Sequence, residues 1–389
     1  MDAEGVPVSA ATGGSDAADV VVIGSGIVGL GAAYAAIRRG LSVIVVDRTD
    51  APVGATIRNF GHLCIGAQEG DARRYADASR ELWLRLSRDA RFWLRESGTL
   101  VAARRADELA VLEQAAAGGG IRMLETDELL RLAPLRSDGL VGGAHIETDL
   151  QTDPRTAAAA IVRHLARSGV EFRFRTAVTA VGTGRVDTTR GPLTAGSIVV
   201  AVNHDLDQLL PEIAERTGVV RCTLDMLRAA VTFRHPLSAP LLTGWSLVRY
   251  GRFADTSSAV ALRERLHAER PDLAALDLNQ MYTQLPDGTL IIGDSHATGV
   301  SPAPFQPEAA FAAFLSEADA LFDMPTPRVL ERWQGVYAKG PQEFLVEQVD
   351  EGVLALAATT GIGMTTGLGL AEENLTAAFG WTPAMEGTA

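Results

Sequence analysis

Lysine is almost absent from this sequence. Of its 35 basic side chains, 34 are arginine and only Lys339 is lysine. Codon usage that favours arginine accounts for the many arginines, but it leaves the one ammonium group to be explained. Acidic residues outnumber basic ones, 48 against 35, so the formal net charge is −13. General binding to nucleic acid or to anionic lipid is therefore not expected.

Cysteine is scarce too, and long hydrophobic runs are missing. Cys64 and Cys222 are the only cysteines, which excludes a disulfide framework and a four-cysteine zinc site. No segment approaches about 18 uncharged apolar residues, so no membrane span is expected. The first residues lack the basic and apolar regions of a signal peptide. We expect residues 1–17 to form a disordered tail and the protein to be cytoplasmic.

What is present begins with one βαβ unit. Residues 20–23 form a short apolar run rich in β-branched side chains, as a buried parallel strand does. A glycine-rich turn follows at once, and residues 30–39 have a helical pattern. Residues 41–46 predict a second buried strand, which ends at Asp47. A strand, a glycine turn, a helix and a second strand in this order predict a nucleotide-binding unit.

The glycine turn fits a dinucleotide. Gly24 permits the tight turn out of the strand, Gly26 lets the backbone approach a pyrophosphate, and Gly29 lets the helix pack closely on the sheet. The helix N-terminus offers free N–H groups and a partial positive charge to the phosphates. The Asp47 carboxylate can accept hydrogen bonds from a ribose diol and would repel a 2′-phosphate, which disfavours NADP.

The rest of the chain alternates between two kinds of pattern. Helices are predicted over 71–96, 154–168, 307–322 and 366–379. Strands are predicted over 171–181, 197–203, 226–235, 245–250, 280–294 and 353–358, with a hairpin turn at Pro286, Asp287 and Gly288. The nucleotide-type segments lie at the start, middle and end of the chain, and segments of antiparallel type lie between them. This order predicts two interleaved domains in an α/β protein.

Two further segments favour FAD over NAD. Residues 54–62 are polar and glycine-rich and follow the second strand, where the middle of a cofactor would pass. Residues 361–366 form a second glycine turn between the last strand and the last helix. The dipole of that helix would stabilise the negative charge that reduced flavin carries around N1 and O2. An NAD enzyme needs no such second turn.

With these motifs in place, the chain resembles the glycine oxidase, sarcosine oxidase and D-amino-acid oxidase family of FAD-dependent oxidoreductases. The resemblance rests on VVVIGSGIVGL near the start, on Thr152-Asp153-Pro154, on 197–202, on 331–335 and on the terminal GIGMTTGLGLAEE. The segment 58–61 together with RWQGVYAKGP more closely resembles a subgroup associated with phosphonate metabolism, whose members are proposed to oxidise aminophosphonates.

The resemblance implies an FAD-binding Rossmann-like domain (18–84, 147–220 and 328–389) interleaved with an antiparallel-sheet α+β substrate domain (85–146 and 221–327). It implies that Val178 contacts the adenosine through its backbone, that Thr56, Arg58 and Asn59 line the flavin, and that residues 363–365 surround its pyrimidine edge. The expected FAD-binding residues are Gly24, Gly26, Ile27, Val28, Gly29, Asp47, Arg48, Thr56, Arg58, Asn59, Val178, Gly361, Gly363, Met364 and Thr365.

The reaction that the resemblance implies is oxidation of a C–H bond next to an amine nitrogen. Hydride passes to flavin N5, and water hydrolyses the imine, so no protein base is strictly required. The expected substrate is a small amine with an anionic group, such as an aminophosphonate or amino acid, and oxygen or another acceptor takes the electrons. The sequence leaves three alternatives open: a flavoprotein that oxidises a 2-hydroxy acid, a non-catalytic FAD-binding protein, and an NAD-dependent enzyme.

An anionic substrate needs donors in this acidic protein. Relatives often carry a carboxylate-binding arginine where this chain has Tyr337, with Lys339 two residues further on. Arg332 is expected in a structural ion pair, and the remaining five histidines are expected to be structural because no metal-ligand spacing is found. Each catalytic candidate also has a structural alternative, either a surface ion pair or core packing. For His62, covalent attachment to the flavin is a second functional alternative. The candidates are Arg58, His62, Tyr250, His296, Tyr337 and Lys339.

Overall fold

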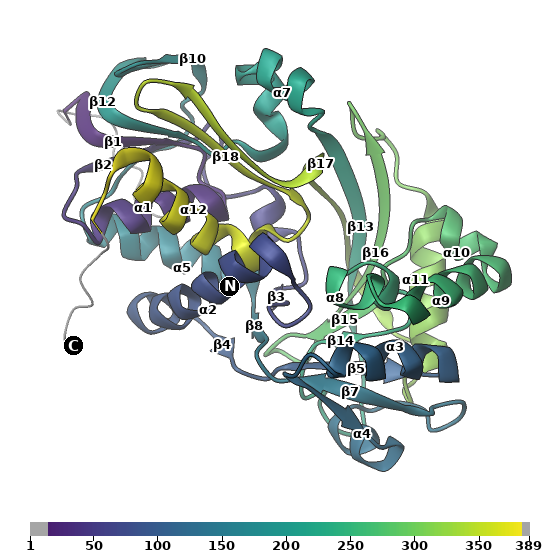
Figure 1. The fold of residues 1–389 in the computed structure, drawn as a ribbon. Coiled ribbons are helices and arrows are strands. Elements are labelled where there is room, and N and C mark those ends of the chain that lie inside the picture. Colours follow the sequence, from purple (N-terminus) through teal and green to yellow (C-terminus); the bar gives the residue numbers. More distant parts are fainter. Residues whose placement is uncertain (1–14, 383–389) are drawn as a thin grey trace.

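Residues 15–382 of the computed structural model form a mixed α/β fold around a 15-stranded sheet and a small three-stranded sheet (Figure 1). Most of the expected N-terminal tail, residues 1–14, lies outside the described residues, as do residues 383–389. The first strand already begins at Ala17, so the last residue of that expected tail belongs to the sheet.

One half of the large sheet is mainly parallel. Its strands run in the order β9, β2, β1, β12, β18 and come from the start, middle and end of the chain. Both faces are buried, since Val20 and Val22 of β1 enter one core and Val21 and Ile23 enter another. The bounds are β1 (Ala17–Ile23), β2 (Val43–Val46), β9 (Glu171–Arg173), β12 (Gly191–Val200) and β18 (Val353–Thr360).

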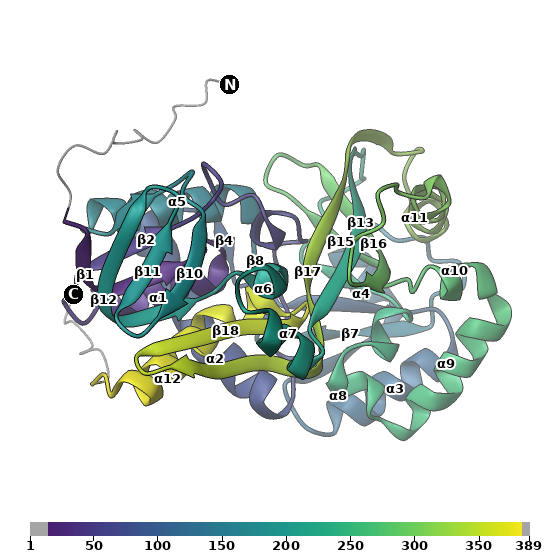
Figure 2. The same cartoon turned by 90° about the horizontal axis from the view of Figure 1, so that it is seen from above.

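Helices cover one face of this half, and a β-layer covers the other (Figure 2). The helices are α1 (Ile27–Ile37), α2 (Gly70–Ala90), α5 (Pro154–Arg167) and α12 (Gly363–Phe379). The opposite face carries β10 (Val178–Gly182), β11 (Arg185–Thr188), α6 (Leu206–Leu209) and α7 (Pro211–Thr217). The nucleotide-type motifs therefore belong to one three-layer arrangement.

The other half of the sheet is mainly antiparallel, in the order β6, β7, β5, β14, β15, β16, β13. Its strands are β5 (Thr99–Ala103), β6 (Ile121–Leu124), β7 (Gly142–Ile146), β13 (Val220–Ala230), β14 (Leu241–Leu242), β15 (Met281–Gln284) and β16 (Leu290–Gly299). The helices packed around it are α3 (Ala106–Ala116), α4 (Thr126–Leu132), α8 (Gly251–Ala254), α9 (Ser257–Glu269), α10 (Pro271–Ala275) and α11 (Glu308–Leu321).

A single long strand joins the two halves. β17 (Arg328–Asp350) spans 23 residues. Its first part pairs with β13 and its second part with β18, and Lys339 pairs with both Val220 and Thr360. The only lysine of the chain therefore lies where the ladder passes from one half to the other. A separate small sheet contains β3 (His62–Leu63), β8 (Leu150–Thr152) and β4 (Leu94–Arg95).

The predicted interleaved α/β fold is confirmed, but several element predictions need correction. The helix predicted over 71–96 ends at Ala90, because Arg91 takes a left-handed conformation (φ 56°) and β4 follows. The strand predicted over 245–250 is wrong. That segment forms a 3₁₀ turn, η3 (Ser246–Val248), because backbone hydrogen bonds close a turn there. A short apolar run that is buried in a turn cannot be told from a strand by its pattern.

Other segments keep their type and change their limits. The strand predicted over 171–181 is two strands, β9 and β10, because Arg175 (φ 52°) turns the chain between them. The strand predicted over 226–235 is β13, which starts at Val220 and ends at Ala230. The hairpin with its turn at Gly288 (φ 83°) is confirmed as β15 and β16.

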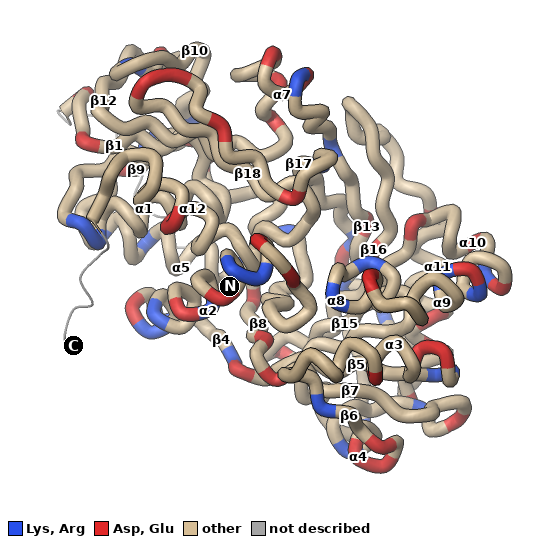
Figure 3. Tube along the Cα trace, viewed as in Figure 1, with Lys and Arg blue, Asp and Glu red and all other residues tan. Residues whose placement is uncertain are grey.

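The charged residues are mixed in sign along the outer helices. In Figure 3, both acidic and basic residues occur along α2, α4 and α9. Within residues 15–382, no helix combines the length and the apolar character that crossing a membrane requires.

Candidate functional site

The first glycine turn forms a close junction between β1 and α1. Gly24 has φ +104°, and a Cβ there would lie 2.5 Å from the carbonyl oxygen of Ala201. A Cβ on Gly29 would overlap the carbonyl oxygen of Gly24. The N-cap residue of α1 is Gly26, which has no side chain to cap the helix. The Ile27 N–H donates to Oγ1 of Thr56 at 2.8 Å. The helix thus presents its N-terminus to the space beside the turn, where a pyrophosphate would bind.

Asp47 lies at the end of β2 beside the same turn. Its Oδ2 accepts from the Ser25 N–H at 2.8 Å and from the Ser25 hydroxyl at 2.6 Å, and its Oδ1 accepts from Thr49 in the same way at 2.9 and 2.8 Å. The backbone donors hold the carboxylate in position. The two hydroxyl donors can be exchanged for the hydroxyls of a ribose, so this carboxylate fits a ribose diol.

The second glycine turn supplies another helix N-terminus. α12 begins at Gly363, three residues before the predicted start, because the Thr366 N–H donates to the Ile362 carbonyl at 3.0 Å. Ile362 offers no side-chain cap. The first N–H groups of a 17-residue helix therefore remain available to an acceptor. This is the geometry expected for the pyrimidine edge of a flavin.

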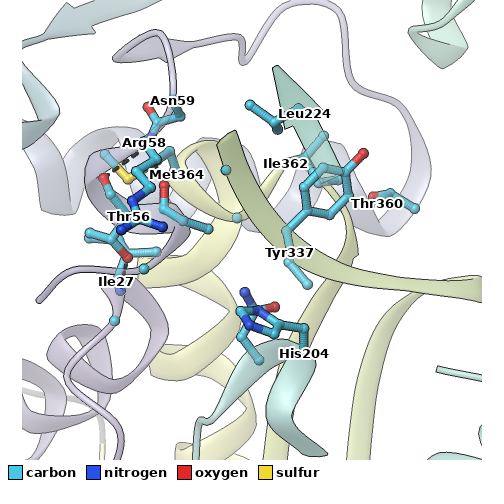
Figure 4. Close-up of a pocket in the computed structure, with 18 of the residues that line it drawn as sticks. Ile27, Thr56, Arg58, Asn59, His204, Leu224, Tyr337, Thr360, Ile362 and Met364 are labelled. Atoms are coloured by element: carbon cyan, nitrogen blue, oxygen red, sulfur yellow. Dashed lines mark hydrogen bonds between the residues drawn. The ribbon is translucent and has the colours of Figure 1, made fainter. Parts of the chain in front are cut away.

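One cavity of about 800 Å³ reaches both helix N-termini. All of the expected FAD-binding residues line it except Gly29, which lies beneath the turn, and all six catalytic candidates line it. Figure 4 shows Thr56, Arg58, Asn59, Tyr337 and Met364 among the side chains around this space. An elongated dinucleotide fits such a cavity, with its pyrophosphate at α1 and its flavin at α12.

Two cofactor candidates have contacts of their own. Arg48 forms an ion pair with Asp205 at 2.6 Å, and its side chain is 54% exposed. Val178, at the start of β10, lines the cavity as expected. Arg332 does not reach the cavity: it pairs with Glu308 at 2.9 Å and lies over the Phe311 ring, as its structural alternative predicted.

Three cationic side chains in the cavity, Arg58, Arg263 and Lys339, lack an ion-pair partner within residues 15–382. Arg263 donates to the Val248 carbonyl at 2.9 Å. Arg58 makes a single 3.5 Å hydrogen bond, to the carbonyl of Gln334. Lys339 is half-buried, and its side-chain ammonium has no hydrogen bond or ion pair within the same range. Gly335, Tyr337 and Lys339 are every second residue of β17, so they lie on the same face of the strand, with about 7 Å between successive members of the row. A Cβ on Gly335 would lie 3.0 Å from the Arg58 carbonyl, so Arg58 and Lys339 lie at opposite ends of this row.

The two tyrosines of the site are uncharged donors, of which Tyr337 is buried and Tyr250 is partly buried. Burial raises the pKa of Tyr337 and of Tyr250, so both keep their protons. The Tyr337 ring lies over Gly361, whose Cβ would be 3.0 Å from the ring. The Tyr250 hydroxyl lies 3.6 Å from Sδ of Met281. The position where the resemblance led us to expect an arginine is therefore filled by a neutral phenol beside the start of α12.

His62 lies in a buried hydrogen-bond chain next to the cavity. Its Nε2 is 2.5 Å from Oγ1 of Thr99 and 3.3 Å from Oδ2 of Asp149, and Thr99 donates to Asp149 at 2.7 Å. Nδ1 is buried and has no partner within the described residues. His62, Cys64 and Asp149 have ligand atoms within 4.8 Å of one another, a spacing that a metal ion could use. Asp149 already accepts from Thr99 and from the Gly66 N–H at 2.6 Å, so hydrogen bonds account for this cluster.

A second polar cluster contains one predicted residue, His296, and three that were not predicted. The Nδ1 of His296 lies 2.9 Å from the carbonyl oxygen of Asp277, and its Nε2 lies 3.4 Å from Oδ2 of Asp294. The Arg249 guanidinium donates to Oδ1 of Asp277 at 2.6 Å. Burial raises the pKa of Asp294 to about 7 and lowers that of His296 to about 3. The cluster thus holds a poised carboxyl beside a neutral imidazole.

Sequence reasoning missed these residues because they come from separate segments of the chain. Arg249 follows η3, Asp277 follows α10, and Asp294 lies in β16 two residues before His296. The only available signal was the polar segment of Gly293, Asp294, Ser295 and His296 inside an apolar hairpin. His204, expected to be structural, also lines the cavity, and burial lowers its pKa.

Known proteins share this architecture. The family model described as FAD dependent oxidoreductase (DAO) matches residues 19–374. Glycine oxidase of Bacillus licheniformis is 26% identical over 196 residues, which are 47% of this chain and only 53% of that relative. Among solved structures, L-amino acid deaminase from Proteus myxofaciens has a TM-score of 0.76 at 16% identity, over 97% of this chain and 93% of its own. L-alpha-glycerophosphate oxidase from Mycoplasma pneumoniae, with FAD bound, has a TM-score of 0.71 at 17% identity, over 94% of this chain and 95% of its own.

The family match agrees with the two helix N-termini and the cavity between them. The cofactor is FAD, and the NAD alternative is wrong. The solved structures share less than a fifth of their residues with this chain, so they establish the fold and not the substrate. The chain belongs to the DAO family of FAD-dependent oxidoreductases.

Proposed function

We propose that the protein oxidises a small amine that carries an anionic group, by removing hydride from the C–H bond next to nitrogen. The observation that carries this proposal is the pair of cavity-lining cations, Arg58 and Lys339, which lack ion-pair partners among residues 15–382 of an acidic protein. Bound FAD supplies the hydride acceptor at N5. The side chains of the cavity would bind and orient the substrate against it.

The roles follow from the chemistry of each group. Arg58 offers a planar fork of donors, and Lys339 offers a compact charge that a flexible stem can place. Tyr337 and Tyr250 donate as neutral phenols, which leaves the anion to the two cations. A dianionic phosphonate is favoured by more than one cation, whereas a carboxylate needs one. Arg58 and Lys339 lie at opposite ends of the row on β17, so both would contact one phosphonate group only with their long side chains extended toward each other. On this arrangement an aminophosphonate is the preferred substrate class, with an amino acid as the second.

The domain division predicted from the sequence is part of this proposal. The FAD-binding domain would consist of 18–84, 147–220 and 328–389, and the substrate domain of 85–146 and 221–327. The arrangement of strands supports it, since the parallel strands lie in the first set and most antiparallel strands in the second. The cavity is lined from both sets. The flavin would then lie against the first domain, and the substrate would meet it from the second.

A second candidate is oxidation of a hydroxyl-bearing anion, such as a 2-hydroxy acid. It is supported by the similar fold of an L-alpha-glycerophosphate oxidase, because the same cations would hold the anion. The third candidate is FAD binding without catalysis.

Anaerobic mixing of the holoenzyme with single substrates separates these candidates. Loss of the visible absorbance of oxidised FAD with 2-aminoethylphosphonate or its N-methyl form, at a higher rate than with glycine or sarcosine, is the expected result. Faster reduction by lactate or glycerol phosphate would favour the second candidate. No reduction by any of them would contradict the proposal and support the third.

A further inference from the structure

Asp294 is a buried carboxyl group that faces the cavity without a cationic partner. Its side chain is 6% exposed and lines the cavity. Its backbone is fixed on both sides, because its N–H donates to the Asn279 carbonyl at 2.7 Å and its carbonyl accepts from the Asn279 N–H at 2.8 Å. Oδ1 is buried and has no hydrogen-bond partner among the described residues. A buried carboxyl oxygen without a donor is costly unless a ligand supplies one.

The neighbouring His296 cannot supply that donor. Its Nδ1 lies 2.9 Å from the carbonyl oxygen of Asp277. A carbonyl oxygen only accepts, so Nδ1 carries the hydrogen. Burial and the charge of Arg249 keep the imidazole neutral by lowering its pKa to about 3. Nε2 therefore turns a lone pair toward Oδ2 of Asp294 at 3.4 Å.

The other charged neighbours leave Asp294 balanced between its two forms. Burial raises its pKa, whereas the Arg249 charge and the neighbouring Asn279 amide lower it, and the Arg249 guanidinium is hydrogen-bonded to Asp277 and not to Asp294. The negative charge of Asp294 in turn raises the pKa of Tyr250 and of Tyr337, so both phenols lie within its electrostatic range. The groups that surround it are Arg249, Tyr250, Asp277, Asn279, His296, Tyr337 and, beyond His296, Lys339.

We infer that Asp294 binds the ammonium group of the substrate at Oδ1 and accepts one proton from it before oxidation. One N–H bond of the ammonium breaks, an O–H bond forms on Asp294, and the electron pair stays on nitrogen, where it can drive hydride departure. The products are a neutral amine and a neutral carboxylic acid. This inference rests on the proposed amine oxidation, and it adds a proton acceptor to a reaction that does not strictly require one.

The geometry separates the two ends of such a substrate. The anionic end meets Arg58 or Lys339 on one side, and the ammonium end meets the unpartnered carboxyl oxygen of Asp294. A carboxyl group poised near neutral pH suits proton transfer in both directions. Before substrate binds, the lone pair of His296 Nε2 can accept a hydrogen bond from the protonated acid at Oδ2, so Oδ1 stays available to the ammonium group.

Asp294→Asn in the holoenzyme tests the inference, and Asp225→Asn is the matched control. Asp225 is also a buried carboxyl, on the neighbouring strand β13, but it does not line the cavity and is hydrogen-bonded to Gln334 at 3.0 Å. If Asp294→Asn does not retain FAD, Asp294→Ser replaces it. At pH 7, reduction of FAD by 2-aminoethylphosphonate should be at least about 100-fold slower in the Asp294 variant. It should recover toward the wild-type rate near pH 10, where the amine loses its proton in solution. Asp225→Asn should keep the wild-type profile.

Calorimetry gives a readout that does not depend on turnover. The probe is 2-amino-2-methylpropylphosphonate, which has no C–H bond next to nitrogen, and propylphosphonate is its amine-free reference. In buffers of different ionisation heat near pH 6, the wild-type holoenzyme should release up to one more proton with the amine than with the reference. Asp294→Asn should release no extra proton.

The outcomes separate the inference from the proposed function. Equal proton release in wild type and Asp294→Asn, or the same loss of rate at every pH, would overturn the role of Asp294 only. Failure of the wild-type holoenzyme to bind either analogue, together with no reduction by any amine, would overturn the proposed function and the inference with it.

Discussion

At the scale of single residues, two positions depart from the carboxylate clamp that the family resemblance led us to expect. Tyr337 places a neutral phenol where an arginine was expected, and Lys339 places a positive charge one step further along the same face of β17. This moves the charge by about 7 Å, from the start of α12 to the junction of the two half-sheets. The site therefore keeps a cation but changes where an anion can sit.

Lys339→Met should weaken the binding of an anionic substrate. A charge-assisted hydrogen bond contributes about 1.5–3 kcal/mol, so kcat/KM should fall by about 10- to 100-fold, mainly through KM. Lys339→Arg should recover part of the loss. Steady-state kinetics together with the rate of FAD reoxidation by oxygen check this. A change in the reoxidation rate alone would assign Lys339 to the reaction with the electron acceptor. Unchanged kinetics would show that Lys339 has no role in substrate binding or in reoxidation.

Gly29→Ala should abolish FAD binding. The added methyl would overlap the Gly24 carbonyl, so the turn that receives the pyrophosphate cannot close. Gly54→Ala is the matched control, because Gly54 also lines the cavity but a Cβ there meets no atom within 4 Å. The measurement is the FAD content of the purified proteins. Normal FAD content in Gly29→Ala would contradict the assigned role of the turn.

At the scale of elements, α12 and β17 determine the reacting end of the cavity. α12 begins at Gly363 with no side-chain cap, so its dipole acts on whatever acceptor lies before it. β17 passes over that point and turns Gly335, Tyr337 and Lys339 toward it. The glycine turns and the amphipathic helices were predictable because their patterns are local. The path of β17 was not, because its pairing with two different strands is decided by long-range contacts.

Met364→Asp should lower the reduction potential of the bound FAD. Met364 lies in the first turn of α12 and lines the cavity, so a carboxylate there would neutralise the helix dipole and oppose the charge of reduced flavin. A helix terminus contributes about 1–2 kcal/mol in a partly buried geometry, which corresponds to about 20–40 mV for a two-electron couple. Potentiometric titration of this variant against Met364→Leu gives the shift. Equal potentials would show that α12 does not act on the flavin.

At the scale of the whole molecule, the site is a product of both half-sheets. That the expected FAD residues would lie around one cavity was predictable from the sequence, because Gly24, Gly26 and Gly363 lie in motifs with a fixed order of strand, turn and helix. The cluster of Arg249, Asp277 and Asp294 was not, since the spacing of residues in separate segments carries no information about their contacts. The two parts of the site meet only when the chain has folded completely.

Burial of Asp294 should make the stability of the apoprotein depend on pH. An unfolded aspartate titrates near 3.9, whereas the folded pKa is about 7, so the folded state holds the proton over the interval between them. The stabilising contribution is complete below about pH 4 and is lost as the pH rises through 7. Its full size is on the order of 4 kcal/mol, from three pKa units at 1.36 kcal/mol each.

Urea unfolding of wild type and Asp294→Asn between pH 4 and pH 8 isolates this contribution, because other buried carboxyls such as Asp225 and Glu108 are common to both proteins. The wild type should lose stability relative to the variant as the pH rises, with most of the loss between about pH 5 and pH 7. A difference in free energy that is constant with pH would mean that Asp294 is ionised in the folded apoprotein throughout. Asp294 would then lack the raised pKa, close to neutral pH, that its inferred role as proton acceptor requires.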